Sequence, residues 1–301
     1  MTSPQCVRCG APRAPGPECP HCGVVYAKAE RFPRPSTPPS AAAVFAQEMS
    51  LEEARSELWL ARLAVPGALV VSWLLVQTGM GRFFFRTFAG MWLHELGHAT
   101  VAWLCGFPAF PGPWLTTIGE ERSPVFALAL MGGLGFAVWR GWTARDRLVT
   151  VAASAALVLQ VIGTMVLSHR AADMMITFGG DAGSLVFGAA FMAAFSAPPG
   201  HKLHRDWLRW GLLVLGAAAF MDTFEEWSHA RADVTTVGYG DEIEGVGDTD
   251  VTKLVDQFRW SIPDLVRRHM AVGWMCLLAL VPLQVLHVRR AQRTLDEIGS
   301  K

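Results

Sequence analysis

Two histidines and a glutamate near position 95 form the pattern in this sequence that is best suited to chemistry. His94, Glu95 and His98 spell His-Glu-x-x-His. On a helix, residues four apart share one face, so both imidazoles can reach a single metal ion. Glu95 lies beside them and can take a proton from a water molecule at that metal. The flanking residues are apolar, and ionisable groups in a bilayer are costly and usually functional, so we interpret the pattern as a catalytic zinc site.

A third metal ligand has to come from elsewhere in the chain, because catalytic zinc takes three protein ligands and keeps one position open. Asp181 is the first candidate. Glycines on both sides of it let another helix approach closely, and a carboxylate at the edge of an apolar span needs a partner. Asp222 is the second candidate, and Asp173 and His169 follow.

Four cysteines lie close together at the start of the chain: Cys6, Cys9, Cys19 and Cys22. They form two Cys-x-x-Cys pairs, and two such pairs can close a tetrahedral thiolate site around zinc. A pair of disulfides is the alternative. We favour a structural zinc site, because so few residues cannot bury an adequate core without a metal.

Composition indicates a membrane protein. Hydrophobic residues make up 51% of the chain and charged residues only 17%, against about 25% charged in soluble domains. Lys and Arg together number 26 and so do Asp and Glu. This balance argues against nucleic acid as a partner, because phosphate binding needs a basic excess.

Seven apolar blocks can form membrane-spanning segments, and several are near the roughly 20 residues that cross a bilayer. They lie near residues 63–78, 83–106, 124–140, 148–168, 176–196, 207–224 and 270–288. All should be helical, because lipid leaves no other way to satisfy the backbone of an isolated segment. The predicted fold is therefore an all-α polytopic membrane protein with six or seven transmembrane helices and a small N-terminal zinc ribbon.

The predicted domain order follows from these patterns. Residues 1–30 form the zinc ribbon, and 31–57 form a Pro/Ala-rich linker with a short charged helix. Residues 58–289 form the transmembrane metalloprotease-like domain, and 290–301 form a basic tail. The connection 225–268 carries ten acidic and five basic residues, so we expect a solvated loop or a small cap there.

Two parts of the sequence resemble a known family. HELGHATVAWLCGF, residues 94–107, resembles the active-site helix of the site-2 proteases, which are intramembrane zinc metalloproteases. The segment PGPWLTTIGEERSPVFALALMGGLG, residues 111–135, resembles a loop and Gly-rich span of one branch of that group. The resemblance covers roughly residues 83–196. It implies a site that opens to the cytoplasmic face, with Asp181 as the nearest counterpart of the family's third ligand.

The predicted function is therefore a zinc-dependent intramembrane endopeptidase, with Glu95 as general base and two zinc ions, one catalytic and one structural. The expected partners are the lipid bilayer, a transmembrane protein substrate and a protein partner for the ribbon. Glycines such as Gly132, Gly133 and Gly135 are expected to leave room for an unwound substrate. The alternatives are a zinc-binding membrane protein without activity and an ion channel or transporter.

A second motif, Thr235 to Asp241, spells the potassium-channel selectivity filter. The charged stretch before it is not a pore helix, so we interpret the match as coincidental. The short basic connections are expected in the cytoplasm, which with seven full spans would place the N-terminus outside. A thiolate zinc site is easier to keep in a reducing cytosol, so the first apolar block, 63–78, is expected not to cross fully. We therefore expect a bacterial inner-membrane protein with a cytoplasmic ribbon.

Overall fold

The computed structural model describes residues 5–6, 8–9, 11–31, 51–204, 206–237, 242–243 and 247–300. These residues belong to two separate units, Met1–Ser50 and Leu51–Lys301. Most of the predicted linker, residues 32–50, lies outside the described part of the chain. Residues 238–241 of the filter-like string lie outside it as well, so the interpretation of that string stays a prediction.

The smaller unit is built from two cysteine-containing loops followed by helix α1 (Tyr26–Arg31). Backbone pairing closes each loop, Gln5 with Pro12 in the first and Glu18 with Val25 in the second. The side chain of Tyr26 is buried together with the cysteines and forms most of the small apolar core. A core of this size cannot stabilise a fold alone, which leaves the cysteines as the main candidates for holding the unit together.

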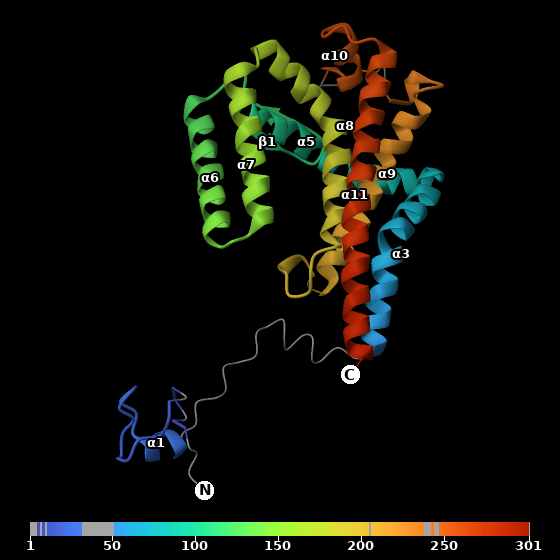
Figure 1. Ribbon diagram of the computed structural model, residues 1–301. Coiled ribbons are helices and arrows are strands. Elements are labelled where there is room, and N and C mark those ends of the chain that lie inside the picture. Colours follow the sequence, from blue (N-terminus) through green and yellow to red (C-terminus); the bar gives the residue numbers. More distant parts are fainter. Residues whose placement is uncertain are drawn as a thin grey trace. The chain divides into compact units, whose positions relative to one another are not determined.

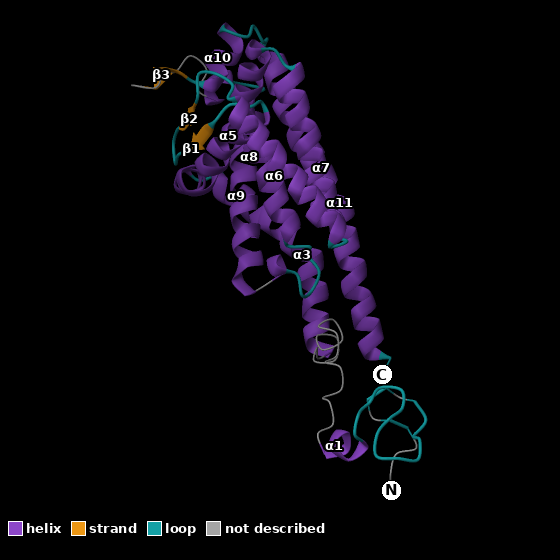
Figure 2. Ribbon diagram, turned by 90° about the vertical axis from the view of Figure 1, so that its left-hand side faces the viewer, coloured by secondary structure: helices purple, strands orange, loops and turns teal. Residues whose placement is uncertain are grey.

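The larger unit is predominantly helical, and its strands are only two or three residues long (Figures 1 and 2). In chain order its elements are α3 (Leu51–Val76), α4 (Gly79–Phe85), η1 (Arg86–Gly90), α5 (Met91–Leu104), β1 (Ala109–Pro111), β2 (Thr116–Ile118), α6 (Pro124–Thr143), α7 (Arg147–Val161), η2 (Ile162–Val166), α8 (His169–Ala194), η3 (Lys202–His204), α9 (Asp206–His229), η4 (Val234–Val237), β3 (Glu242–Ile243), β4 (Gly247–Asp248), α10 (Asp250–Asp256) and α11 (Ile262–Gly299).

Polar residues just before the apolar runs begin several of these helices. Ser123, Asp146, Ser168 and Ser261 each precede a helix, and each side chain accepts a hydrogen bond from the backbone N–H three residues later. Such N-caps satisfy donors that the first helical turn leaves unpaired. The local sequence therefore determines where α6, α7, α8 and α11 begin.

Five helices of the described part of the chain are long and apolar enough to cross a membrane: Leu51–Val76, Pro124–Thr143, Arg147–Val166, His169–Ala194 and Ile262–Gly299. The prediction of a helical, membrane-type protein is confirmed at this level. The predicted count of six or seven spans is not confirmed. Helix α9 covers the predicted span 207–224 but is not one of the five.

The predicted span 83–106 has an unexpected local structure. It is helical through most of its length, but α4 and α5 are joined by a π-helical turn, η1. The backbone angles at both ends of that turn are right-handed helical, so the helix continues through it. In Figure 1 this segment runs across the direction of α8 and α11 rather than along it. A π turn widens the helix locally and is frequent at functional sites.

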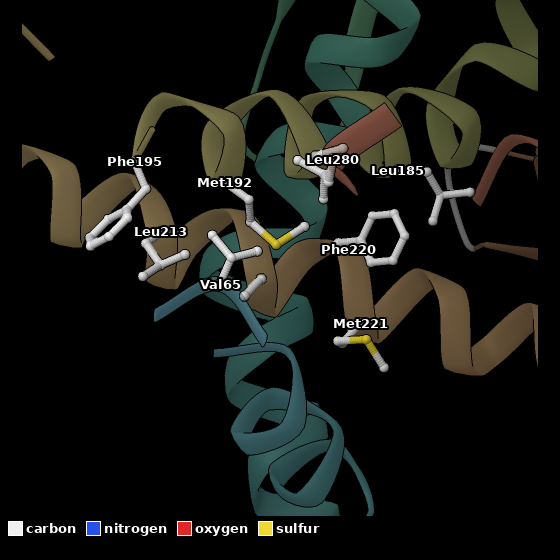
Figure 3. Packing of buried hydrophobic residues seen from close by; sticks show 10 residues of the cluster. Val65, Leu185, Met192, Phe195, Leu213, Phe220, Met221 and Leu280 are labelled. Carbon is white, nitrogen blue, oxygen red and sulfur yellow. The ribbon is translucent and has the colours of Figure 1, made fainter. Parts of the chain in front are cut away.

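A cluster of large apolar side chains packs α8 and α9 against α3 and α11 (Figure 3). The labelled residues are Leu185, Met192 and Phe195 of α8, Leu213, Phe220 and Met221 of α9, Val65 of α3 and Leu280 of α11. In contrast, α6 buries only Ala127 and Gly141. The apolar surface of α6 suits contact with lipid, whereas α3, α8, α9 and α11 form the packed core.

The connection predicted as a solvated loop or a small cap contains helix α10. Val251 and Leu254 of α10 are buried in a cluster with Trp227, Trp260 and other residues from the ends of α9 and α11. This part of the connection is therefore a packed cap. The predicted basic tail is helical too, because α11 extends for 38 residues to Gly299. That length is about 57 Å, which exceeds the roughly 30 Å hydrocarbon core of a bilayer.

Candidate metal centre

Helix α5 presents both motif histidines on one face, as the four-residue spacing predicts. The Nε2 atoms of His94 and His98 lie 3.0 Å apart. The side chain of His98 is buried, and that of His94 is partly exposed. Two ring nitrogens this close, both directed to the same point, are the arrangement that two imidazoles adopt around a metal ion.

A third ligand atom reaches the same point from a distant part of the chain. Oδ2 of Asp250, at the start of α10, lies 2.8 Å from Nε2 of His98 and 3.2 Å from Nε2 of His94. His94, His98 and Asp250 form one of two groups of potential metal-ligating side chains within the described residues. The sequence interpretation did not select Asp250, one of ten acidic residues in the 225–268 connection.

The local charges keep Asp250 in its metal-binding form. Burial raises the pKa of its carboxyl, but contact with His98 and His94 lowers that pKa by more than burial raises it. The pKa therefore lies well below its usual range. The carboxyl is therefore ionised at neutral pH, and only an ionised carboxylate binds a metal strongly. Thr249 caps α10 by accepting a hydrogen bond from the N–H of Thr252 at 3.3 Å, which places Asp250 in the first turn of that helix.

Asp181 lies on the far side of His94 from this group. Its Oδ1 is 2.9 Å from Nδ1 of His94, and its Oδ2 accepts a hydrogen bond from Nε1 of Trp227 at 3.0 Å. His98 is held in the same way, with Nδ1 2.7 Å from the carbonyl oxygen of Ile176. Such contacts fix the tautomer and orientation of metal-ligating histidines and make their free nitrogens more basic. The predicted role of Asp181 as a ligand itself stays a prediction.

The other sequence candidates for a third ligand are engaged elsewhere. Asp222 lies 3.3 Å from Nε of Arg86. Asp173 lies 3.5 Å from Nε2 of His169, and both of those side chains are exposed. None of the three belongs to a group of potential metal ligands within the described residues.

Glu95, the general base predicted from the sequence, is buried beside the two histidines in the cavity. It is 4% exposed. Oγ1 of Thr116, on β2, lies 2.7 Å from Oε2 of Glu95 and 2.8 Å from its backbone oxygen. The β1–β2 hairpin therefore holds Glu95 through the side chain of Thr116. Thr116 was not identified from the sequence, which carries no signal that a threonine 21 residues away contacts this glutamate.

Backbone contact between α5 and α8 sets the spacing of the site. A Cβ atom added at Gly97 would collide with the carbonyl oxygen of Gly179, and one added at Gly183 would collide with Cα of Gly97. A Cβ at Gly180 would lie 2.6 Å from Nε2 of His98. These glycines therefore allow the close approach that brings Asp181 to His94.

The site opens into a cavity of about 480 Å³. Its walls come from η1, α5, the β1–β2 hairpin, α8, α9, η4 and the start of α10. A space of this size accommodates a short peptide segment or a small molecule. Thr235, Thr236 and Val237 of the filter-like string are among the lining residues.

The four cysteines of the smaller unit form a second potential metal site, in which one ligand atom from each lies within 4.8 Å of the others. The Sγ atoms of Cys6 and Cys22 are 3.8 Å apart, and those of Cys9 and Cys19 are 3.7 Å apart. These distances are far longer than the roughly 2.05 Å of a disulfide, and all four cysteines are free. The disulfide alternative is therefore not what the structure contains.

Two of these thiols are favoured as thiolates, the form that binds metal. Burial raises the pKa of Cys19, but hydrogen bonds, chiefly from the backbone N–H groups of His21 and Cys22, together have a larger, lowering effect. The resulting pKa is about 6. The pKa of Cys6 is lowered too, chiefly by backbone N–H groups of its own loop. The loops thus supply hydrogen bonds that stabilise negative charge on sulfur.

No protein-family model, curated protein or solved structure matches the chain. The assignment of the two sites therefore depends on the positions of the described side chains. The resemblance of the motif helix to the site-2 proteases stays an expectation from the sequence.

Proposed function

We propose that the larger unit is a zinc-dependent endopeptidase that cleaves peptide bonds within or beside a membrane. One observation carries the proposal: Nε2 of His94, Nε2 of His98 and Oδ2 of Asp250 converge beside the buried Glu95 in a single cavity. The five apolar helices support a membrane location. The resemblance of residues 94–107 to the site-2 proteases supports the reaction type.

Zinc suits both groups of ligand atoms. Four sulfurs at about 2.3 Å from a tetrahedral zinc ion lie about 3.8 Å from one another, close to the 3.7 and 3.8 Å of the cysteine cluster. Nitrogen and oxygen ligands at about 2.0–2.2 Å lie about 3.3–3.5 Å apart, and the atoms of the histidine group are only slightly closer, at 2.8 to 3.2 Å. His94, His98 and Asp250 would hold the catalytic ion, and the four cysteines would hold the structural one.

The residues around the cavity have separate roles in the proposed hydrolysis. Zinc, when bound, lowers the pKa of water and polarises a carbonyl group. Glu95 accepts a proton from the attacking water, whose oxygen bonds to the scissile carbonyl carbon. As the C–N bond breaks, Glu95 delivers that proton to the leaving amine. Thr116 holds the carboxylate in place, and Asp181 and the Ile176 carbonyl orient the two imidazoles.

The membrane setting defines the proposed substrate and partners. The substrate is a transmembrane protein whose helix unwinds locally so that a peptide bond can enter the cavity. We propose an inner bacterial membrane as the location, with the zinc ribbon in the cytoplasm, where it binds a protein partner or stabilises the N-terminus. Four thiolates around one zinc ion leave no open position, so the ribbon itself is not catalytic.

Removal of two ribbon cysteines tests the two-zinc account. Purified protein should contain about two zinc equivalents by elemental analysis, given the two ligand sets. The double substitution Cys6→Ser and Cys9→Ser should lower the content to about one equivalent, because two thiolates hold zinc weakly. The matched control is Cys105→Ser together with Cys276→Ser, which should leave both equivalents bound. Loss of both zinc ions, or of neither, in the ribbon variant would contradict the proposal.

Trp227 provides a test of the contacts behind His94. Trp227→Phe removes the N–H donor to Asp181 but keeps an aromatic ring over His269, from which the Trp227 ring centroid lies 3.8 Å away. We expect the zinc affinity of the histidine site to fall by about 10-fold or more, as is typical when such an outer contact is lost. A chelator competition titration measures the affinity. Trp260→Phe, another buried tryptophan, is the control and should leave the affinity unchanged.

Chelation tests the activity itself. The purified protein is reconstituted in liposomes with a labelled single-span substrate and then assayed with and without a zinc chelator. We expect cleavage that the chelator abolishes and added zinc restores, because the reaction needs a metal with an open position. A protein that binds two zinc ions but cleaves none of a broad panel of membrane-embedded peptides would support the alternative, an inactive zinc-binding membrane protein.

A further inference from the structure

The cavity around the proposed zinc site carries an excess of negative charge. Six carboxylates line it: Glu95, Asp181, Asp222, Glu226, Asp248 and Asp250. The basic side chains among its described lining residues are Arg86 and Lys253. These two and a divalent metal ion offset only part of the negative charge. A cavity with a single sign of charge attracts ligands of the opposite sign.

On the wall formed by η1 and α9, two carboxyl groups share one guanidinium. Arg86 contacts Oδ2 of Asp222 through Nε at 3.3 Å and Glu226 through Nη2. Asp222 and Glu226 are one helical turn apart on α9, so both face the same space. One guanidinium therefore serves two carboxyl groups at this wall.

Two hydrogen-bond acceptors in this region have no partner among the described residues. Oδ1 of Asp222 and Oγ of Ser184 are both buried and unbonded. Asp222 is only 3% exposed and Ser184 is fully buried, yet both residues line the cavity. A buried carboxylate oxygen without a donor is costly. A positively charged hydrogen-bond donor would satisfy Oδ1 of Asp222, and a donor would also satisfy Oγ of Ser184, which can accept as well as donate.

The position of these acceptors relative to the metal site indicates which part of a substrate they meet. A Cβ atom at Gly90 would lie 3.1 Å from Oδ2 of Asp222, and Gly90 precedes His94 by four residues. The two positions are therefore about 6 Å apart along the continuous helix of η1 and α5. An extended peptide advances about 3.3 Å per residue, so a side chain close to the scissile bond can reach Asp222.

We propose that Asp222 and Ser184 form a subsite for a cationic side chain, lysine or arginine, in the peptide that is cleaved. The ammonium or guanidinium group donates to Oδ1 of Asp222 and Oγ of Ser184, while Arg86 holds Oδ2 of Asp222 in place. This inference rests on the proposed zinc-peptidase function and adds a substrate preference to it.

The test uses three N-acetyl amino-acid hydroxamates with arginine, norleucine or glutamate side chains. The hydroxamate group binds the metal in all three, so only the side chain differs. Dissociation constants are measured with zinc-loaded, detergent-solubilised protein. We expect the arginine compound to bind about tenfold or more tightly than the norleucine compound, since a hydrogen bond to a charged group contributes at this level. The glutamate compound should bind most weakly.

Three variants separate the subsite from general effects. Asp222→Asn should abolish the preference for arginine over norleucine, and Ser184→Ala should reduce it in part. Asp173→Asn is the matched control, because Asp173 is an exposed ion-paired aspartate on α8, and it should keep the full preference. If Asp222→Asn does not fold, the wild-type preference and its partial reduction in Ser184→Ala still decide the question.

The outcomes distinguish the two levels of the proposal. Equal binding of the arginine and norleucine compounds to wild-type protein would overturn the cationic subsite and leave the zinc site intact. A preference that persists in Asp222→Asn would also overturn it. Failure of all three hydroxamates to bind zinc-loaded protein would instead overturn the proposed function.

Discussion

Replacement of Glu95 by glutamine is expected to lower the rate of peptide-bond cleavage by about 10²-fold or more while both zinc ions stay bound. The glutamine amide has the shape of the carboxyl group, and its oxygen can still accept the hydrogen bond from Thr116. It cannot accept the proton of the attacking water. Because Glu95 lies outside the group formed by His94, His98 and Asp250, the metal ligands are unchanged.

Rate and zinc content have to be measured on the same preparation of the Glu95→Gln variant. Glu121→Gln is the matched control, because Glu121 is exposed and does not line the cavity, and it should keep wild-type turnover. Loss of one zinc equivalent in Glu95→Gln would make Glu95 a ligand rather than a base. Wild-type turnover in that variant would move the role of base to another group.

Asp250→Ala is expected to remove the zinc of the larger unit and with it all zinc-dependent cleavage. Two imidazoles alone hold zinc weakly, and this substitution removes a carboxylate oxygen that lies within 3.2 Å of both Nε2 atoms. Elemental analysis should then find about one equivalent, that of the cysteine cluster. Asp181→Asn should keep the zinc but bind it about 10- to 100-fold more weakly, because the variant weakens the contact that orients His94.

A nearby aspartate provides the control for this pair. Asp248→Ala removes another cavity-lining carboxylate two residues before Asp250, and zinc content should stay at two equivalents. The reverse result is equally informative. If Asp181→Ala loses the zinc of the larger unit while Asp250→Ala keeps it, the ligand assignment derived from the sequence is correct and the one proposed from the structure is wrong.

The parts of the site that sequence reasoning identified are those that one helix places together. His94, Glu95 and His98 lie within five residues, and helical geometry alone brings both imidazoles to one face. Asp250 lies 156 residues from His94, and its position depends on how the 225–268 connection packs over α8. Local signals for the start of α10 exist in Thr249 and Asp250, but they do not say where that helix lies.

In the fold, as in the site, the features that depend on neighbouring residues were predicted, and a feature at a contact between distant segments was not. Apolar length correctly predicted helices over most of the proposed spans, because a bilayer-length apolar run is a local property. The π turn at Arg86–Gly90 was not predicted. It occurs where Arg86 contacts Asp222 and where Gly90 lies against the same carboxylate, so it lies against a helix more than 130 residues away in the sequence.

Two groups of glycines in the described part of the chain are expected to differ in their tolerance to substitution. Gly97, Gly179, Gly180 and Gly183 lie where one added methyl group would meet backbone or imidazole atoms, whereas Gly132, Gly133 and Gly135 of α6 have no atom within 4 Å of that methyl position. Alanine at the first set separates α5 from α8 and disrupts the site, but alanine at the second set meets only open space. In a library of single variants, the first set should be almost invariant among active clones and the second freely substituted. The glycine positions that stay unchanged as the sequence varies should therefore mark the helix faces that must stay in close contact.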